Sequence, residues 1–219
     1  ENPARPFTVI IGGAKISDKV DAVNNLLKIA DKVLVGGAVA NVFLKAQGCG
    51  LGASFIEDVF VDAKRREKKD WVVYAKEILE KYKDKIICPM DLVISDGVSE
   101  KNIDISSEGV PEGWMALDIG AKTQKLFSDI IEKSETVFLG GPMGKFENEK
   151  FAQGSKAILA AMRNNKGVTT IAGGDTIDLV RKYGNLENYS NISLAGGATL
   201  EFLAGKELPA LKPLMEEQK

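Results

Sequence analysis

Hydrophobic and polar positions follow one another in blocks along this chain, and one block pattern recurs five times. A run of four or five β-branched or apolar residues ends in two adjacent glycines, and an amphipathic segment follows. The glycine pairs are Gly12-Gly13, Gly36-Gly37, Gly140-Gly141, Gly173-Gly174 and Gly196-Gly197. Short apolar runs bounded by glycine are typical of buried strands, so the pattern predicts five strand–turn–helix units.

The segments after the glycine pairs have helical periodicity. Apolar residues from Val20 to Ala30 recur at i, i+3 and i+4 spacing, and Ser17 is expected to cap that helix. The segment from Phe151 to Ala161 repeats the pattern, and the segment from Ile177 to Val180 does so more weakly. Strands that alternate with helices imply a parallel sheet.

Right-handed crossovers bring every strand-to-helix turn to the carboxyl edge of such a sheet, where open α/β folds bind ligands. The predicted fold is therefore a Rossmann-like three-layer α/β/α domain with a mostly parallel central sheet of about six strands.

Residues 48–115 depart from this rhythm. Residues 48–58 form a glycine-rich loop, and residues 58–84 predict a long charged stretch of one or two helices. A further strand is expected to be interrupted at Pro89, and an extended segment then leads to a helix that begins near Lys122.

Composition narrows the function. The 219 residues are 44% hydrophobic with a net charge of −2, which gives no support for a nucleic-acid or basic membrane surface. No apolar run reaches the roughly 18 residues of a membrane span, and no signal-peptide pattern is present. The two cysteines have no metal-site spacing, and the absence of histidine excludes Ser-His and Cys-His catalysis. We expect a cytoplasmic monomer.

The turns also carry candidate chemistry. Glycines at helix N-termini admit anions, although they also simply make tight turns. Lys15 and Lys19 are four residues apart, so they would lie on one helix face if both were helical. Such a pair either binds a polyphosphate or is an ordinary exposed pair on a solvated face. Asp175 and Thr176 begin a predicted helix, where the carboxylate would hold Mg²⁺ or cap the helix.

The segment "GGPMGKFENEKF" shapes a loop through Pro142 and Gly144, and Phe146 and Glu147 are expected to open a helix. Glu147 would bond a ribose hydroxyl or serve as an ordinary first-turn acid. The chain has no P-loop motif, and no G-x-G-x-x-G follows the first strand.

The motifs as a set resemble a known family. "RPFTVIIGGAKISDKV", "VGGAVANVFLKAQG", "GWMALDIGAKT", "GGPMGKFENEKFAQGSKAI", "GGDT" and "AGGATLEFLAGKELPAL" resemble, in order and spacing, the C-terminal, nucleotide-binding half of phosphoglycerate kinase. The resemblance covers Arg5 to about Leu211. It implies reversible phosphoryl transfer between 1,3-bisphosphoglycerate and Mg-ADP, with the nucleotide bound by this half and the phosphoglycerate by an N-terminal lobe.

The resemblance also implies roles for single residues. Lys15 is similar to the lysine that approaches the transferred phosphoryl group, and Lys19 to the one that holds nucleotide phosphates. The adenosine-binding positions are Gly13, Ala14, Gly36, Gly37, Ala116, Leu117, Pro142 and Glu147. The phosphate and metal turn is Gly173, Gly174, Asp175 and Thr176, with Asp175 as the Mg²⁺ ligand. Gly173, Gly196 and Gly197 are similar to glycines that face the transferred group.

The chain departs from the family pattern at several positions. Gly140 replaces an asparagine, Lys145 a valine, and Ala38 a third glycine. "NISLAGG", which begins at Asn191, stands where the family has "HISTGGG". These changes affect the expected strength of ADP binding more than its location.

The N-terminal lobe's motifs do not appear in the chain. Glu1 is not methionine and "ENPARPF" is similar to a linker, so residues 1–6 are expected to be a linker remnant, with removal of a tag or of methionine as the alternative. Residues 7–211 are the predicted nucleotide-binding domain and residues 212–219 a tail. The chain is expected to bind nucleotide and to be nearly inactive alone; a stand-alone binding module and a non-catalytic scaffold are the alternatives.

Overall fold

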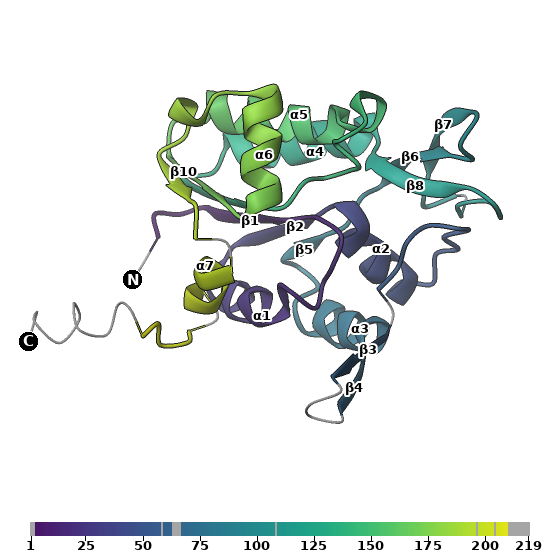
Figure 1. Cartoon of the computed structure of the whole chain (residues 1–219), viewed down its shortest axis with the longest axis horizontal. Coiled ribbons are helices and arrows are strands. Elements are labelled where there is room, and N and C mark those ends of the chain that lie inside the picture. The colour runs from purple at the N-terminus through teal and green to yellow at the C-terminus, as the bar shows by residue number, and fades with distance from the viewer. Residues whose placement is uncertain are drawn as a thin grey trace, which may run out of the picture.

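The central feature of the computed structural model is a six-stranded, all-parallel sheet (Figure 1). The structure describes residues 3–57, 59–62, 67–107, 109–195, 197–203 and 205–209. The strand order is β11-β10-β9-β1-β2-β5. The strands span Phe7–Ile11 (β1), Lys32–Val35 (β2), Ile86–Ile87 (β5), Thr136–Gly140 (β9), Val168–Ala172 (β10) and Asn191–Ser193 (β11). The prediction of a parallel sheet of about six strands is confirmed.

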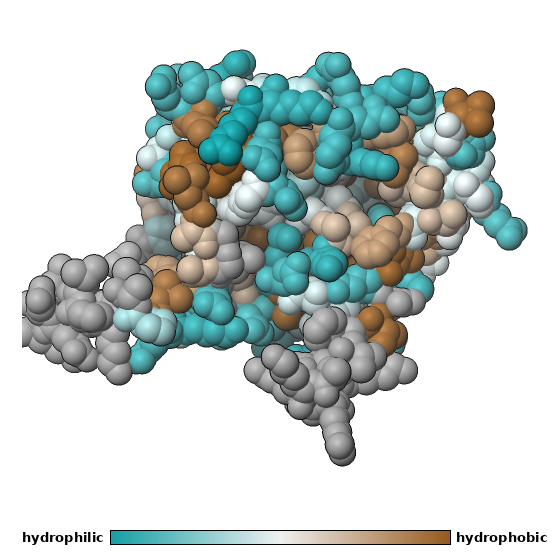
Figure 2. All heavy atoms as spheres, viewed as in Figure 1, coloured by the Kyte–Doolittle hydropathy of each residue, from teal (hydrophilic) through white to brown (hydrophobic). Residues whose placement is uncertain are grey.

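Helices cover both faces of the sheet (Figure 1). One layer contains Val20–Ile29 (α1), Gly37–Ala46 (α2), Trp71–Lys81 (α3) and Gly197–Leu203 (α7). The other contains Ala121–Glu132 (α4), Gln153–Asn164 (α5) and Gly174–Tyr183 (α6), with hydrophilic side chains over much of its outer surface in Figure 2. Short 3₁₀ turns lie at Glu149–Phe151 and Leu186–Asn188.

The two layers form separate hydrophobic cores on opposite faces of the central strands. Val9 and Ile11 of β1 pack with the α1–α3 layer, whereas Ile10 packs with the α4–α6 layer. Successive side chains of a strand point to opposite faces, so this continuous apolar strand supplies both cores. The three-layer α/β/α prediction is therefore confirmed.

A small antiparallel sheet follows β5 in the chain. It has the order β7-β6-β8, from Asp91–Ser95 (β6), Glu100–Asp104 (β7) and Met115–Ile119 (β8). The break at Pro89 is confirmed, since it separates β5 from β6. The helix expected near Lys122 is α4, whose first backbone N–H groups are bonded by the Asp91 carboxylate.

The prediction of helix throughout residues 58–84 is wrong in its first half. Val59–Asp62 (β3) and Glu67–Asp70 (β4) pair antiparallel, and among the described residues of this stretch only those of α3 are helical. Residues 58 and 63–66 lie outside the described residues. The Asp70 side chain accepts hydrogen bonds from the backbone N–H groups of Val72 and Val73, at 2.9 and 3.0 Å, and so caps α3 at this point. Successive charged residues such as Glu67 to Asp70 show no strand alternation, which is why the sequence suggested a charged helical stretch.

Residues 3–6 are joined to the domain. The Arg5 guanidinium pairs with Asp31, and the Pro6 carbonyl accepts hydrogen bonds from the N–H groups of Glu135 and Thr136. Of the predicted domain boundaries, the tail at 212–219 lies outside the described residues, and the linker at 1–6 stays a prediction.

Candidate functional site

The turns that follow β1 and β9 bond directly to each other at the carboxyl edge of the sheet. The N–H of Gly12 donates to the Gly140 carbonyl (3.1 Å), and the N–H of Gly13 donates to the Pro142 carbonyl (2.8 Å). A Cβ added to Gly12 would lie 2.1 Å from the Pro142 oxygen, and one added to Gly141 would lie 2.3 Å from the Gly12 oxygen. These glycines are required because backbone packs on backbone, and their bonded N–H groups are not free for an anion.

The turn after β10 is different because it is open. A Cβ added to Gly174 would meet no atom within 4 Å, and no side chain caps α6. Gly173 is the N-cap, with a φ of 96° that favours glycine. Asp175 is therefore not the cap, which removes that alternative, and its exposed side chain lies in the first helical turn. Uncapped N–H groups at a helix start can bind an anion.

Thr176 faces inward from the same turn. Its hydroxyl oxygen accepts a hydrogen bond from the Gly141 N–H at 2.8 Å, and the residue is buried. The side chain thus fixes α6 to the turn after β9, and Gly173, Gly174 and Asp175 form the accessible part of the predicted phosphate and metal turn.

Lys19 projects into the site from the start of α1. Its ammonium lies against Gly13, where an added Cβ would be 3.3 Å from Nζ. Burial lowers the pKa of Lys19. The negative charges of Asp18, Asp175 and Glu57 raise it, but by less than burial lowers it. With the residues that the structure describes, the ammonium forms neither a hydrogen bond nor a salt bridge. A half-buried cation without a partner is suited to an anionic ligand.

The segment that carries the lysines is not the helix that the spacing predicted. The helix α1 begins at Val20, with Lys19 as its uncapped N-cap, so Lys15 precedes the helix and is exposed. Ser17 does not cap α1; its backbone N–H and hydroxyl donate to the two carboxylate oxygens of Glu57, at 3.0 and 2.5 Å. A carboxylate 40 residues away in sequence thus replaces the local cap, and the lysines do not share a helix face.

Two adjoining cavities open at this edge of the sheet. The first, which we call the charged cavity, has a volume of about 490 Å³. Its lining includes Asp18, Lys19, Asp21, Gly140, Gly173, Gly174, Asp175, Glu201 and Lys206. Lys206 and Asp21 form a salt bridge of 3.1 Å at its rim, which joins the segment after α7 to α1.

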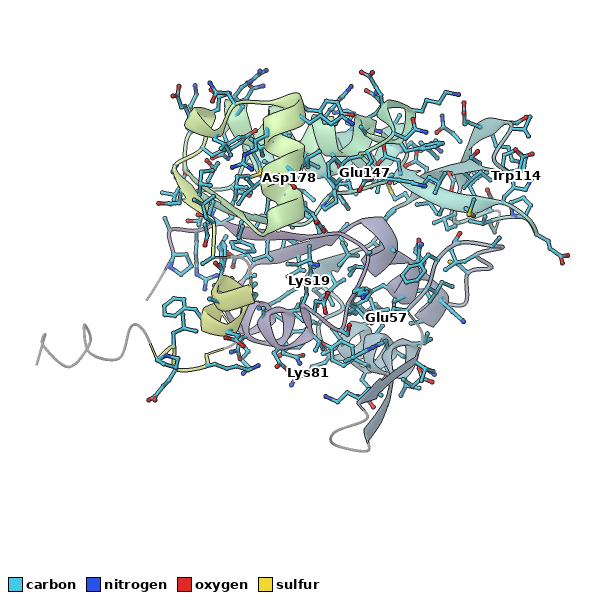
Figure 3. All side chains as sticks on the ribbon, in the orientation of Figure 1. Lys19, Glu57, Lys81, Trp114, Glu147 and Asp178 are labelled. Carbon is cyan, nitrogen blue, oxygen red and sulfur yellow. The ribbon has the colours of Figure 1, made fainter. Side chains whose placement is uncertain are left out.

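The second cavity, the apolar slot, has a volume of about 420 Å³. One wall is Gly13, Ala14, Gly37 and Ala38, and further lining residues are Phe55, Met115, Ala116, Leu117 and Pro142. Asp175 lines both cavities, so the slot and the charged cavity adjoin at α6. In Figure 3 Lys19 and Glu57 lie on the α1 side of this region and Glu147 on the α6 side.

Most of the predicted site residues lie along these two cavities, and a few do not. Gly36 lines neither cavity, because a Cβ there would meet the Met143 sulfur at 2.3 Å. Gly197 begins α7, and Gly196 lies outside the described residues. Glu147 lines the slot from a turn and not from the helix expected there, since α5 begins later, at Gln153.

Some of the positions at which the chain departs from the family pattern line the cavities, and others do not. Gly140 lines the charged cavity, and Ala38 and Lys145 line the slot. Asn191 lies on the edge strand β11 and lines neither cavity. Three of these four positions therefore bear directly on the site.

Sequence reasoning missed several polar residues around the site, among them Asn41, Glu57, Asp118 and Lys206. Asp118 is buried at the slot, and burial raises the pKa of its carboxyl to about 7. Hydrogen bonds from backbone N–H groups, chiefly that of Gly154, act in the opposite direction and lower the pKa. In the sequence, Asp118 in the strand "ALDIG" and Asn41 in the helix "VANVF" stand among apolar residues and look like core positions. Only the fold reveals the cavity beside them.

The described residues contain no helix long and apolar enough to cross a membrane. They also contain no group of three or more His, Cys, Asp or Glu side chains that could hold a metal ion by themselves. Asp175 is an exposed carboxylate beside an open helix start, an arrangement that suits a metal ion bridged by a ligand's phosphates.

The fold and the site define a doubly wound parallel α/β domain with its cavities at the carboxyl edge of the sheet. The family model for phosphoglycerate kinase matches residues 1–206. This chain belongs to the phosphoglycerate kinase family.

Individual relatives agree with this assignment. The phosphoglycerate kinase of Thermosipho africanus is 45% identical over 228 residues, covering 100% of this chain and 54% of that protein. The Pseudothermotoga lettingae protein is 42% identical, covering 99% and 53%. The solved phosphoglycerate kinase of Coxiella burnetii matches with a TM-score of 0.86 and 33% identity, covering 97% of this chain and 53% of that one. The chain thus spans about half the length of the relatives it matches.

Proposed function

We propose that this chain is the nucleotide-binding half of a phosphoglycerate kinase and binds Mg-ADP or Mg-ATP across the two cavities. The base and ribose occupy the apolar slot, with Glu147 at the ribose, and the phosphates extend into the charged cavity. The observation that carries the proposal is the half-buried Lys19 ammonium without a partner among the described residues, opposite an uncapped helix start.

The charges support this orientation of the nucleotide. A polyphosphate supplies the anion that Lys19 lacks and accepts hydrogen bonds from the N–H groups at the start of α6. Asp175 joins the two cavities, where one carboxylate and the phosphates would share a Mg²⁺ ion. Because Thr176 already accepts the Gly141 N–H, the proposed role of that residue is to fix α6 in place.

The whole enzyme would transfer a phosphoryl group between 1,3-bisphosphoglycerate and ADP. Phosphoryl transfer depends on positioning and on neutralising charge rather than on a covalent group. Lys15 is exposed, lies on the segment that leads to Lys19 and lines neither cavity, and it would approach the transferred group from outside them. The 219-residue chain alone is expected to bind nucleotide and to turn over very slowly, because closure by a second lobe excludes water and completes such sites.

Calorimetric titration of the chain with ADP, with and without Mg²⁺, tests the binding proposal. The Lys19→Met variant should bind about tenfold to a hundredfold more weakly, since charge-assisted hydrogen bonds contribute about 1.5–3 kcal/mol. Lys28→Met is the matched control, because Lys28 is exposed on α1 and bonds only locally to Asn25. Absence of binding at millimolar ADP would favour a scaffold role instead.

A coupled assay with 1,3-bisphosphoglycerate and Mg-ADP tests the low activity of the chain alone. Turnover well above the uncatalysed rate would overturn that part of the proposal. Tight binding without turnover is also what a stand-alone nucleotide-binding module would give, so adding the N-terminal half of a relative separates the two. Restored transfer supports the kinase half.

A further inference from the structure

A buried amide, Asn41, lies at the apolar slot without a role in any of the contacts above. It is one helical turn after Gly37 on α2, so both residues face the same side, and both line the slot. Only 3% of Asn41 is exposed. Buried amides normally have all their polar atoms bonded, so the partners of this one need to be identified.

The orientation of the amide is fixed by one hydrogen bond. Its Nδ2 donates to the Phe55 backbone carbonyl at 2.9 Å. A carbonyl can only accept, so the NH₂ end must face Phe55 and the oxygen must face the other way. Oδ1 accepts nothing from any residue that the structure describes, and it is not enclosed by protein atoms, so it opens onto the slot.

The other polar side chains of the slot cannot substitute for this acceptor. The two carboxylate oxygens of Asp118 accept the N–H groups of Ile119 and Gly154, at 2.9 and 2.8 Å. Glu147 and Asp175 are charged and exposed, and Asp175 marks the end of the slot that adjoins the charged cavity. Asn41 does not line the charged cavity, so its oxygen is an uncharged acceptor away from the phosphates.

We propose that Asn41 selects the base of the nucleotide by accepting a hydrogen bond from an amino group at the 6-position of a purine. This inference rests on the proposed nucleotide site. Adenine presents an amino donor at that position, whereas hypoxanthine and guanine present a carbonyl oxygen. A 6-oxo purine would oppose its oxygen to Oδ1 and leave a buried acceptor unsatisfied, which costs more than the hydrogen bond itself contributes.

The wild-type chain gives the first test, by calorimetric titration with ADP and with inosine diphosphate at equal Mg²⁺. Inosine diphosphate has a carbonyl at the 6-position, with a proton on the adjacent nitrogen, and otherwise matches ADP. We expect ADP to bind about tenfold more tightly. Equal affinities would overturn this inference and leave nucleotide binding intact, whereas binding of neither nucleotide would overturn both.

The Asn41→Leu variant gives the second test. It removes the acceptor at similar volume, so the ratio of the two dissociation constants should fall to about one. Ser54→Ala is the control, because Ser54 accepts the Ala116 N–H at 2.8 Å and so fixes the same segment without facing the base. That variant should weaken both nucleotides equally. An unchanged ratio in Asn41→Leu would overturn the inference; if that variant does not fold, Asn41→Ala takes its place.

Discussion

Glu57 holds Ser17 by both of its carboxylate oxygens, one bonded to the backbone N–H and the other to the hydroxyl. The pair connects the segment after the slot's Phe55 to the segment that carries Lys15 and Lys19. Since α1 has no side-chain cap, this carboxylate helps to order the chain before the helix, together with the buried Ile16. The position of the lysines therefore depends on a contact remote in sequence.

Replacement of Ser17 by alanine should weaken Mg-ADP binding about fivefold, because one charge-assisted hydrogen bond that orders the lysine segment is lost. Calorimetry measures the change. Ser106→Ala is a matched control, since that hydroxyl donates to Asp104 at 2.6 Å on an exposed turn away from the site. In a Glu57→Ala background the Ser17 substitution should have no further effect on affinity, and additive effects would contradict the coupling.

Lys19→Met should make the ligand-free chain more stable at neutral pH. Burial lowers the folded-state pKa of Lys19, so below its ordinary value of 10.5 the unfolded chain binds more protons. The wild-type free energy of unfolding should therefore rise with pH between the lowered folded-state pKa and 10.5. The variant should lack this dependence. Thermal unfolding at several pH values measures the difference in stability. Each kcal/mol of added stability should raise the melting temperature by about 2–4 °C. A less stable variant would show that the lysine is favourably paired.

ADP binding should take up protons at alkaline pH. The phosphates favour the charged ammonium, so they raise the pKa of Lys19 when they bind. Calorimetry in two buffers of different ionisation enthalpy at the same alkaline pH detects the uptake. Lys19→Met should abolish it, and equal apparent enthalpies in the wild type would place the phosphates away from this lysine.

The glycines should divide into two classes on substitution by alanine. Gly12→Ala brings a methyl group within 2.1 Å of the Pro142 oxygen and should destabilise the fold by about 3 kcal/mol or more. Gly174→Ala adds a methyl in open space at the start of α6 and should leave stability unchanged or slightly improved. Urea unfolding measures both. Gly174→Ala should nevertheless weaken ADP binding, because the methyl occupies the approach to the helix start.

Asp118 should titrate near neutral pH. Burial raises the pKa of its carboxyl to about 7, so between 3.8 and about 7 the folded chain holds a proton that the unfolded chain has released. The contribution of Asp118 to stability therefore falls as pH rises through that window. The carbon-13 chemical shift of the carboxyl measures the titration directly, and a midpoint near 4 would mean that the backbone donors outweigh burial.

The repeated strand–glycine–helix pattern predicted five of the six strands of the main sheet, and a separate apolar run predicted the sixth, β5. Apolar runs such as Phe7–Ile11 are buried on both sides, and that environment leaves a local signature in the sequence. The helical faces after the first, third and fourth glycine pairs were recognised for the same reason. The pairing of β3 with β4 was missed, because charged residues in a strand do not report which strand they pair with.

The sequence by itself determined the fold class and the edge of the sheet at which the cavities open, and most of the site residues that it predicted line those cavities. Only the tertiary structure decided which role each residue has. Glycines that look alike in sequence divide into those that pack on a neighbouring backbone, as Gly12 does, and those in open space, such as Gly174. Ser17 bonds Glu57 instead of capping its helix, and Asn41 keeps an unbonded oxygen at the slot. The reason is physical: period and propensity act over a few residues, whereas close packing, burial and hydrogen-bond partners are set by segments that meet only in the folded chain.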